Sequence, residues 1–147
     1  MKIYLDVCCL NRPFDDQTQD RIHLETEAIL SVLNHSRTAG WSVIGSDAID
    51  FEINKMPDDD KRLMVQILST IFDTHVKVDA GLERRAVELK RTGLKAMDAL
   101  HVACAEKGKA DILLTTDDNF LSKALKIQRT LKVKVENPLR WVMGVLK

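Results

Sequence analysis

The sequence predicts an α/β fold with three layers, in which helices cover both faces of a parallel five-stranded sheet. Short apolar runs rich in β-branched residues alternate with longer segments whose apolar residues recur at helical spacing. The short runs are continuously apolar, which is typical of strands buried on both faces of a parallel sheet. A chain of 147 residues is long enough for one sizeable core, so we expect one domain over residues 1–147.

The predicted strands and helices alternate along the whole chain. We expect strands at 2–6, 41–45, 75–78, just before Asp117, and 132–135. Helices are expected at about 18–37, around Glu52, after Pro57, at 80–91, within 94–107, after Phe120 and from Pro138 onward.

Some boundaries and inward-facing positions follow from single residues. Pro13 and the Asp15–Asp16 pair are turn residues, so segment 7–17 is expected to be a loop. Ser46 and Asp47 are good residues to begin the helix that carries Glu52. The apolar residues expected to face the core include Ile22, Leu24, Leu63, Ile67, Leu68 and Ile71.

The composition is that of an ordinary globular protein. Hydrophobic residues make up 45% and charged residues 30% of the chain. No apolar run approaches the roughly 20 residues that span a bilayer, and no signal-peptide pattern follows Met1. The cysteines (Cys8, Cys9 and Cys104) have neither disulfide-framework nor zinc spacing. We therefore expect a cytoplasmic protein that does not associate with membranes.

The zero net charge conceals an asymmetry between the two halves of the chain. Residues 1–83 hold 8 Lys and Arg against 15 Asp and Glu, whereas residues 84–147 hold 14 against 7. The formal charges are therefore −7 and +7. Both head-to-tail self-association and a basic nucleic-acid-binding face are consistent with this distribution.

The stretch Leu94–Phe120 (LKAMDALHVACAEKGKADILLTTDDNF) contains the most informative pair of acids. It is predicted to form a helix, a short turn, a strand and the start of a second helix. Asp98 lies in the first turn of an otherwise apolar helix, and Asp117 lies just past the strand. One interpretation is that both acids only complement helix dipoles or cap helices. The alternative is that both bind a divalent cation, because a carboxylate on an apolar helix is costly unless it is neutralised.

Other acids are predicted to lie at the same edge of the sheet. Asp6 follows the first strand and Glu52 comes shortly after the second. Sites in open parallel sheets form beyond the carboxyl ends of the strands, where the strand order reverses. Four ionised carboxylates repel one another strongly. A hard cation relieves that repulsion, and ligation by oxygen alone favours Mg²⁺ or Mn²⁺.

These residues, in this order, match the motifs of a known family. With IYLD at Asp6, SDAIDFE at Ser46 and Glu52, MDALHVA at Asp98 and TTDDNF at Thr115 and Asp117, the chain resembles the PIN-domain nucleases over nearly its whole length. The toxins of VapBC-type toxin–antitoxin pairs belong to that family.

The resemblance implies a metal-dependent endoribonuclease. By resemblance, Asp6, Glu52, Asp98 and Asp117 are the catalytic and metal-binding acids, and Thr115 is a supporting hydroxyl. Asp117 is preferred over Asp118 because Phe120 then falls three positions after the acid, as in the family. The resemblance also implies an RNA substrate, a small antitoxin partner and a homodimer.

The sequence departs from the family at one position. Many members carry a polar residue, typically Asn, two positions after the first acid, where this chain has Cys8. Asn11 is a candidate to take over that support. The departure motivates a second hypothesis, a module that keeps the acids but binds RNA or a protein with little turnover. Aspartyl-phosphate chemistry is disfavoured, because Cys8 stands where such phosphatases need a second Asp.

Several other residues have both a structural and a functional interpretation. His101 is expected to be a packed histidine bonded to backbone rather than a metal ligand, and Trp41 and Trp141 are expected in the core or an interface. Arg12 and Lys95 are expected to be surface charges, with phosphate contacts as the alternative. A further set of basic residues is expected to lie on a solvated surface; the alternative is that it forms an RNA-binding edge. This set is Lys123, Lys126, Arg129, Lys132 and Lys134.

Overall fold

The computed structural model describes residues 1–145 and confirms the predicted α/β class. Its five strands form one parallel sheet in the order β3-β2-β1-β4-β5. The strands are β1 (Lys2–Leu5), β2 (Ser42–Ser46), β3 (Thr74–Val76), β4 (Ile112–Leu114) and β5 (Lys134–Glu136).

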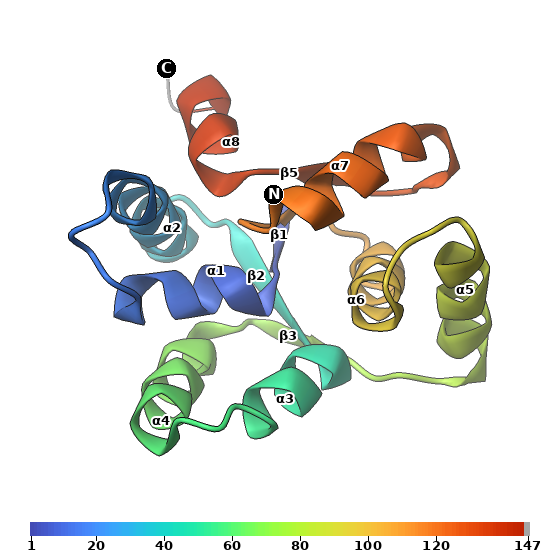
Figure 1. Cartoon of the computed structure of the whole chain (residues 1–147), viewed down its shortest axis with the longest axis horizontal. Coiled ribbons are helices and arrows are strands. Elements are labelled where there is room, and N and C mark those ends of the chain that lie inside the picture. Colours follow the sequence, from blue (N-terminus) through green and yellow to red (C-terminus); the bar gives the residue numbers. More distant parts are fainter. Residues whose placement is uncertain (146–147) are drawn as a thin grey trace.

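Within residues 1–145, eight helices connect and cover these strands (Figure 1). They are α1 (Val7–Asn11), α2 (Asp20–Thr38), α3 (Asp47–Asn54), α4 (Asp59–Leu68), α5 (Ala80–Arg91), α6 (Ala96–Lys107), α7 (Asp118–Lys126) and α8 (Pro138–Val145). Short 3-10 turns occur at Arg12–Phe14, Ser69–Ile71 and Gln128–Thr130.

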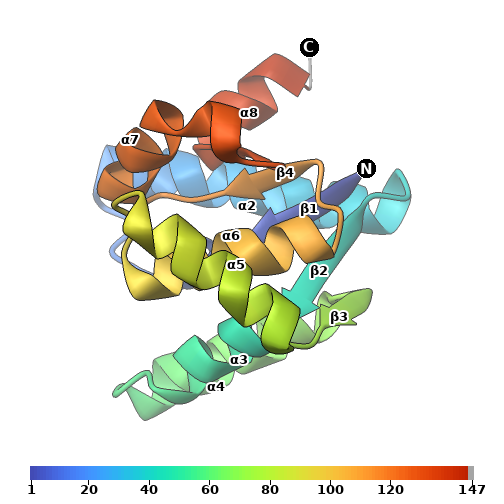
Figure 2. The same ribbon diagram turned by 90° about the vertical axis from the view of Figure 1, so that its right-hand side faces the viewer.

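The helices lie on both sides of the sheet, as predicted. In Figure 1, α1 and α2 lie to the left of the strands, and α6 and α5 lie to the right. Figure 2 shows α5 and α6 in front of the sheet with α2 behind it. α5 packs on α6, and α8 packs on α2. The central strand β1 is buried from Ile3 to Leu5, so the core extends over both of its faces.

The segment predicted as a loop, 7–17, is largely helical, and that prediction was wrong. α1 begins directly after β1 because the Asp6 carboxylate accepts a hydrogen bond from the Val7 amide at 2.8 Å. Val7, Cys9 and Leu10 of this helix are buried. Pro13 fits because it lies in the first turn of the 3-10 segment, where a proline needs no amide donor.

Three of the residues predicted to face the core are exposed. Leu63 and Ile67 of α4 have exposed fractions of 55% and 57%, and Leu24 of α2 has 48%. Leu68 and Ile71 are only partly buried. α4 packs against α1 and α3 and buries only Val65. The helical spacing of its apolar residues therefore does not mean that this helix packs broadly against the sheet.

The two tryptophans lie against the core and against each other. The rings of Trp41 and Trp141 are 5.4 Å apart between centroids, and His35 stacks on Trp41 at 5.0 Å. Both tryptophans are partly buried, as expected of residues in a core margin. This contact joins the start of β2 to α8.

In the part of the chain that is described, no helix is long and apolar enough to cross a bilayer.

A charged cluster lies beside the buried apolar residues on the inner face of α2. Glu25 is only 1% exposed and accepts hydrogen bonds from Arg12 Nε at 2.9 Å and Arg21 Nε at 3.3 Å. Asn137 Nδ2 donates to the same carboxylate at 2.6 Å. Glu25 therefore ties α2 to the 3-10 turn before it and to the residue before α8.

We expect Glu25→Gln to lower the free energy of unfolding by about 1–3 kcal/mol, because the Arg12 and Arg21 guanidiniums then face an uncharged amide at a buried position. Urea denaturation followed by circular dichroism measures this difference. The matched control is Glu27→Gln, an exposed position on the same helix, which should change stability by less than about 0.5 kcal/mol. Equal stability of the two variants would contradict the structural role given to Glu25.

Candidate functional site

The candidate site lies at the carboxyl edge of the sheet, around the end of β1. β1 is the strand at which the order reverses, since β2 pairs with one side of it and β4 with the other. Asp6 directly follows β1, and its amide donates to the carbonyl of Leu114 at the end of β4. The residues that follow β1 and β4 are therefore adjacent in space, as expected of parallel strands.

Asp6 is a buried carboxylate held by several donors. One oxygen, Oδ1, accepts the Val7 amide, and Oδ2 accepts the Thr115 hydroxyl at 2.9 Å. Thr115 is fully buried, and Asp6 is 6% exposed. The structure therefore brings Asp6 and Thr115 into direct contact.

Cys8 also contacts Asp6, although its thiol stands where the family usually has an amide. Its Sγ lies 3.3 Å from Asp6 Oδ2 and 3.4 Å from Thr115 Oγ1. The Thr116 amide donates to the same sulfur at 3.3 Å. Asn11 does not replace this support: within residues 1–145 the hydrogen-bond partners of the Asp6 carboxylate are Val7, Cys8 and Thr115. The buried Oδ1 of Asn11 has no partner in that range either.

Asp117 caps α7 and is linked to the same cluster. Its Oδ1 accepts the amides of Asn119 and Phe120 at 2.9 and 3.2 Å, and its own amide donates to Thr115 Oγ1 at 3.1 Å. Asp118 is different: it is 71% exposed and forms a two-pronged ion pair with Arg21 at 2.7 Å. The geometry thus separates the two neighbouring aspartates, and only Asp117 is joined to Thr115.

Asp98 is coupled electrostatically to the other three acids. Partial burial together with the nearby charges of Asp6, Asp117 and Glu52 raises the pKa of Asp98 from 3.8 to about 6, while His101 opposes this shift. Asp98 lies in the first turn of α6, where the helix dipole favours a negative charge. The raised pKa shows that repulsion and desolvation outweigh that benefit.

Glu52 joins the cluster from α3 through a histidine. His101 Nε2 lies 2.5 Å from Glu52 Oε1 and 3.8 Å from Asp6 Oδ1. His101 is fully buried, and its other nitrogen, Nδ1, lies 2.6 Å from the Tyr4 hydroxyl. His101 was predicted to bond to backbone, and that prediction was wrong because both ring nitrogens bond to side chains.

The surroundings of His101 favour its charged form. Burial alone would lower the pKa of His101, but the hydrogen bond to Glu52 and the charges of Asp6, Glu52 and Asp98 raise it above its ordinary value of 6.5. Sequence reasoning missed the roles of Tyr4 and His101. A polar residue at i+3 from Asp98 on an apolar helix was the one available signal.

The ligand atoms of Asp6, Glu52 and His101 lie within 4.8 Å of one another, close enough to share one metal ion. A second such group, Asp47, Asp50 and His75, is exposed on the outside of α3 and β3. Its carboxylate Asp47 is already used by His75 and by the Val78 amide. The first group contains two of the four predicted acids, Asp6 and Glu52, together with His101, and it does not include Asp98 or Asp117.

No lysine or arginine within residues 1–145 forms an ion pair with Asp6, Glu52, Asp98 or Asp117; the ion pairs of Asp6 and Glu52 are with His101. Arg12 is engaged elsewhere, with Glu25 and Asp15. Lys95 is exposed beside the start of α6. Within the described residues, His101 is therefore the one basic side chain that forms ion pairs with these acids.

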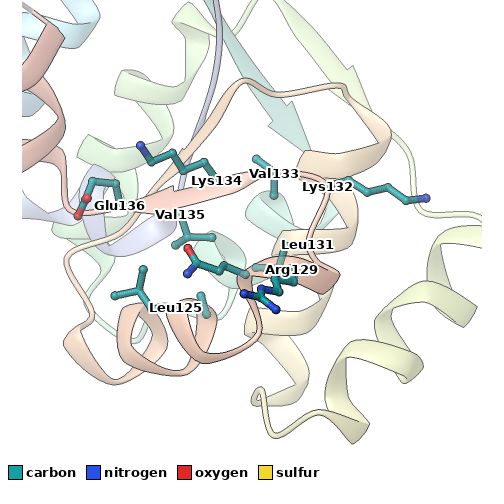
Figure 3. A pocket seen from close by; sticks show the side chains of 10 residues that line it. Leu125, Arg129, Leu131, Lys132, Val133, Lys134, Val135 and Glu136 are labelled. Carbon is teal, nitrogen blue, oxygen red and sulfur yellow. The ribbon is translucent and has the colours of Figure 1, made fainter.

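The basic residues after α7 do not converge on the carboxylates. They border a cavity of about 390 Å³ between α7 and β5, with Leu125, Leu131 and Val135 among its lining (Figure 3). In Figure 3 the side chains of Lys132 and Lys134 extend in opposite directions along the strand. This cavity includes none of the four acids and is not the candidate site.

The fold and this edge define an α/β domain with four acidic residues gathered at the switch point of a parallel sheet. The family model described as "PIN domain" matches residues 3–126, most of the chain. The chain belongs to the PIN domain family. Comparison with curated proteins gives no significant match.

Solved structures share the fold at low sequence identity. FitAcB from Neisseria gonorrhoeae is similar with a TM-score of 0.61 and 16% identity, over 92% of this chain and 97% of that one. VapBC2 from Rickettsia felis, bound to a DNA fragment from its promoter, gives 0.57 and 15%, over 93% and 98%. VapBC-1 from nontypeable Haemophilus influenzae gives 0.54 and 11%, over 94% and 98%.

The raised pKa of Asp98 predicts a pH-dependent stability in metal-free protein. A carboxyl whose folded pKa is above its unfolded value stabilises the fold below about pH 4, and this contribution is lost as the pH rises through about 6. Asp98→Asn removes this dependence. In the presence of EDTA, the Asn variant should therefore be more stable than wild type at pH 7.5, with the difference vanishing near pH 3.5.

Urea denaturation at a series of pH values checks this expectation. The control is Asp60→Asn, an exposed acid in the first turn of α4, for which the difference from wild type should stay nearly constant over the same range. A pH-independent difference for Asp98→Asn would contradict the raised pKa of Asp98.

Proposed function

We propose that this protein is a Mg²⁺- or Mn²⁺-dependent endoribonuclease and the toxin of a toxin–antitoxin pair. The observation that carries the proposal is that four acids from separate elements interact electrostatically with one another. Asp6, Glu52 and Asp117 all raise the pKa of Asp98, and none of the four acids is paired with a lysine or arginine within the described chain. PIN domains are generally nucleases, and this chain belongs to that family.

The residues at this edge fit a hard divalent cation. Carboxylate oxygens are the ligands that Mg²⁺ and Mn²⁺ prefer. Asp6, Glu52, Asp98 and Asp117 would hold the ion. A bound cation polarises a phosphate oxygen, lowers the pKa of a water ligand and stabilises the leaving oxygen.

The chain itself fixes the orientation of the acids. Asp6 is held by the Val7 amide and the Thr115 hydroxyl. In Asp117, Oδ1 is used by the cap of α7, which leaves Oδ2 for the site. The Glu52 side chain is 33% exposed, so it reaches solvent and is the candidate to orient an attacking water.

An RNA substrate is proposed because the family resemblance implies it. The site is an open edge, so a single-stranded or loop region is the form whose backbone can reach the acids. Lys95, exposed beside Asp98, is the nearest basic side chain in sequence that remains available for a phosphate.

Partners are proposed from the structural neighbours. Two of these neighbours are VapBC complexes and one is FitAcB. A small antitoxin that silences the nuclease, a homodimer and a cytoplasmic location all belong to this proposal.

We favour the nuclease over the alternative of a binding module with little turnover. That alternative depended on Cys8 leaving Asp6 without support, but the Cys8 thiol lies within hydrogen-bond distance of Asp6 and Thr115. No observation of the structure favours this alternative.

The adjacent aspartates provide a sharp test of the site. Asp117→Asn keeps the cap of α7, since Asn caps helices as well as Asp does, but removes a charge from the cluster. We expect metal-dependent cleavage of a generic single-stranded RNA to fall by more than about 100-fold, beyond the usual range for losing an outer-shell partner of a metal site. Asp118→Asn, one residue away, should keep the activity, because Asp118 faces Arg21 at the surface.

Cleavage is measured with a fluorescent RNA in Mn²⁺, in EDTA, and in EDTA with Mn²⁺ restored. Activity that survives EDTA removes the metal from the proposal. Equal loss in both variants, or loss in Asp118→Asn alone, would overturn the assignment of Asp117.

A further inference from the structure

A continuous chain of hydrogen bonds runs from the sheet to Glu52. The Ser46 hydroxyl at the end of β2 lies 2.8 Å from the Tyr4 hydroxyl of β1, which lies 2.6 Å from His101 Nδ1 of α6. His101 Nε2 contacts Glu52 Oε1 of α3. Ser46, Tyr4 and His101 have no exposed surface, so Glu52 is the only member that reaches solvent.

The roles of donor and acceptor along this chain follow from its two ends. An ionised Glu52 can only accept, so His101 Nε2 must donate to it. At the other end, Ser46 Oγ accepts the Ile49 amide at 3.1 Å. Tyr4 remains protonated, because burial and the nearby groups Cys104, Asp6 and Glu52 raise its pKa. Every polar atom of the chain thus has a partner, and the imidazole ring is held at both nitrogens.

This arrangement restricts how Glu52 can turn. One carboxylate oxygen, Oε1, is fixed to a buried ring that is itself fixed to two strands. The other, Oε2, accepts no hydrogen bond from residues 1–145 and is left for the site. A glutamate with a 33% exposed side chain would otherwise sample several rotamers.

We propose that His101 is a positioning residue that holds Glu52 in one orientation toward the acidic cluster, with Tyr4 and Ser46 fixing the ring. The inference rests on the proposed function, and it specifies how the side chain of Glu52 is oriented in that site. Metal sites commonly use such outer hydrogen bonds to orient their ligands. His101 also lies one turn after Asp98 on α6, so the same bonds hold the helix that carries Asp98 against β1 and β2.

The test compares two amides of different reach. In His101→Gln the side-chain N–H lies near the position of Nε2 and can still donate to Glu52, whereas the shorter Asn reaches only the Nδ1 position. His101→Asn should lose about 10- to 100-fold in Mn²⁺ affinity or kcat, the usual cost of an outer-shell partner. His101→Gln should lose clearly less. The control His23→Asn, at an exposed position on α2, should match wild type.

Mn²⁺ affinity is measured by calorimetry without RNA, and kcat and KM are measured separately with RNA. A merely structural role would lower the melting temperature of both variants and leave Mn²⁺ affinity and kcat of the folded protein equal between them. That result overturns the proposal. If His101→Asn does not fold, Tyr4→Phe decides: it keeps the ring and Glu52 but frees Nδ1, and we expect a partial loss in the same direction.

The measurements also separate this inference from the function on which it rests. Wild-type protein that binds Mn²⁺ but cleaves no RNA would overturn the nuclease, while weaker Mn²⁺ binding in His101→Asn than in His101→Gln would still support the positioning role. Wild-type protein that binds no Mn²⁺ would overturn both. Active wild type with equal Gln and Asn variants would overturn only the positioning role.

Discussion

Repulsion among carboxylates at one edge of the sheet is the constraint that shapes the rest of this structure. Parallel strands end at the same edge, so Asp6 after β1 and Asp117 after β4 are brought together by the topology. α6 adds Asp98 to the same edge and α3 adds Glu52. Burial, and then the charges of Asp6, Asp117 and Glu52, raise the pKa of Asp98. An arrangement that costs free energy in the metal-free protein is typical of a functional site.

The chain limits this cost with neutral donors. Backbone amides at the starts of α1 and α7 donate to Asp6 and Asp117, and the Thr115 hydroxyl donates to Asp6. These donors fix the directions of the carboxylates, but as neutral groups they do not cancel the charge. His101 is the one basic side chain within residues 1–145 that forms ion pairs with the cluster, and it is shared between Glu52 and Asp6.

The features that could be predicted from the sequence are those that depend on hydrophobic periodicity and on the order of the elements along the chain. Strands, most helices and the common edge of the acids follow from short apolar runs that alternate with amphipathic segments. Segment 7–17 was predicted incorrectly because turn residues such as Pro13 also fit a 3-10 turn, and the cap by Asp6 cannot be seen without coordinates. The exposure of Leu63 and the burial of Glu25 depend on which neighbours each helix meets, as does the contact between His101 and Tyr4.

Glu25 shows how this chain treats a buried acid when no further cation is needed. Its carboxylate is 1% exposed, yet two arginines and Asn137 donate to it within the chain. The same protein therefore has the means to neutralise a buried carboxylate locally. At the sheet edge it does not use them: Asp98 and Asp117 form no ion pair with any basic side chain in the described residues. Arg21 of α2 lies near the start of α7 in the folded chain, but it pairs with Asp118 and not with Asp117. The contrast between the two clusters is the strongest physical support for the proposed cation site at this edge of the sheet.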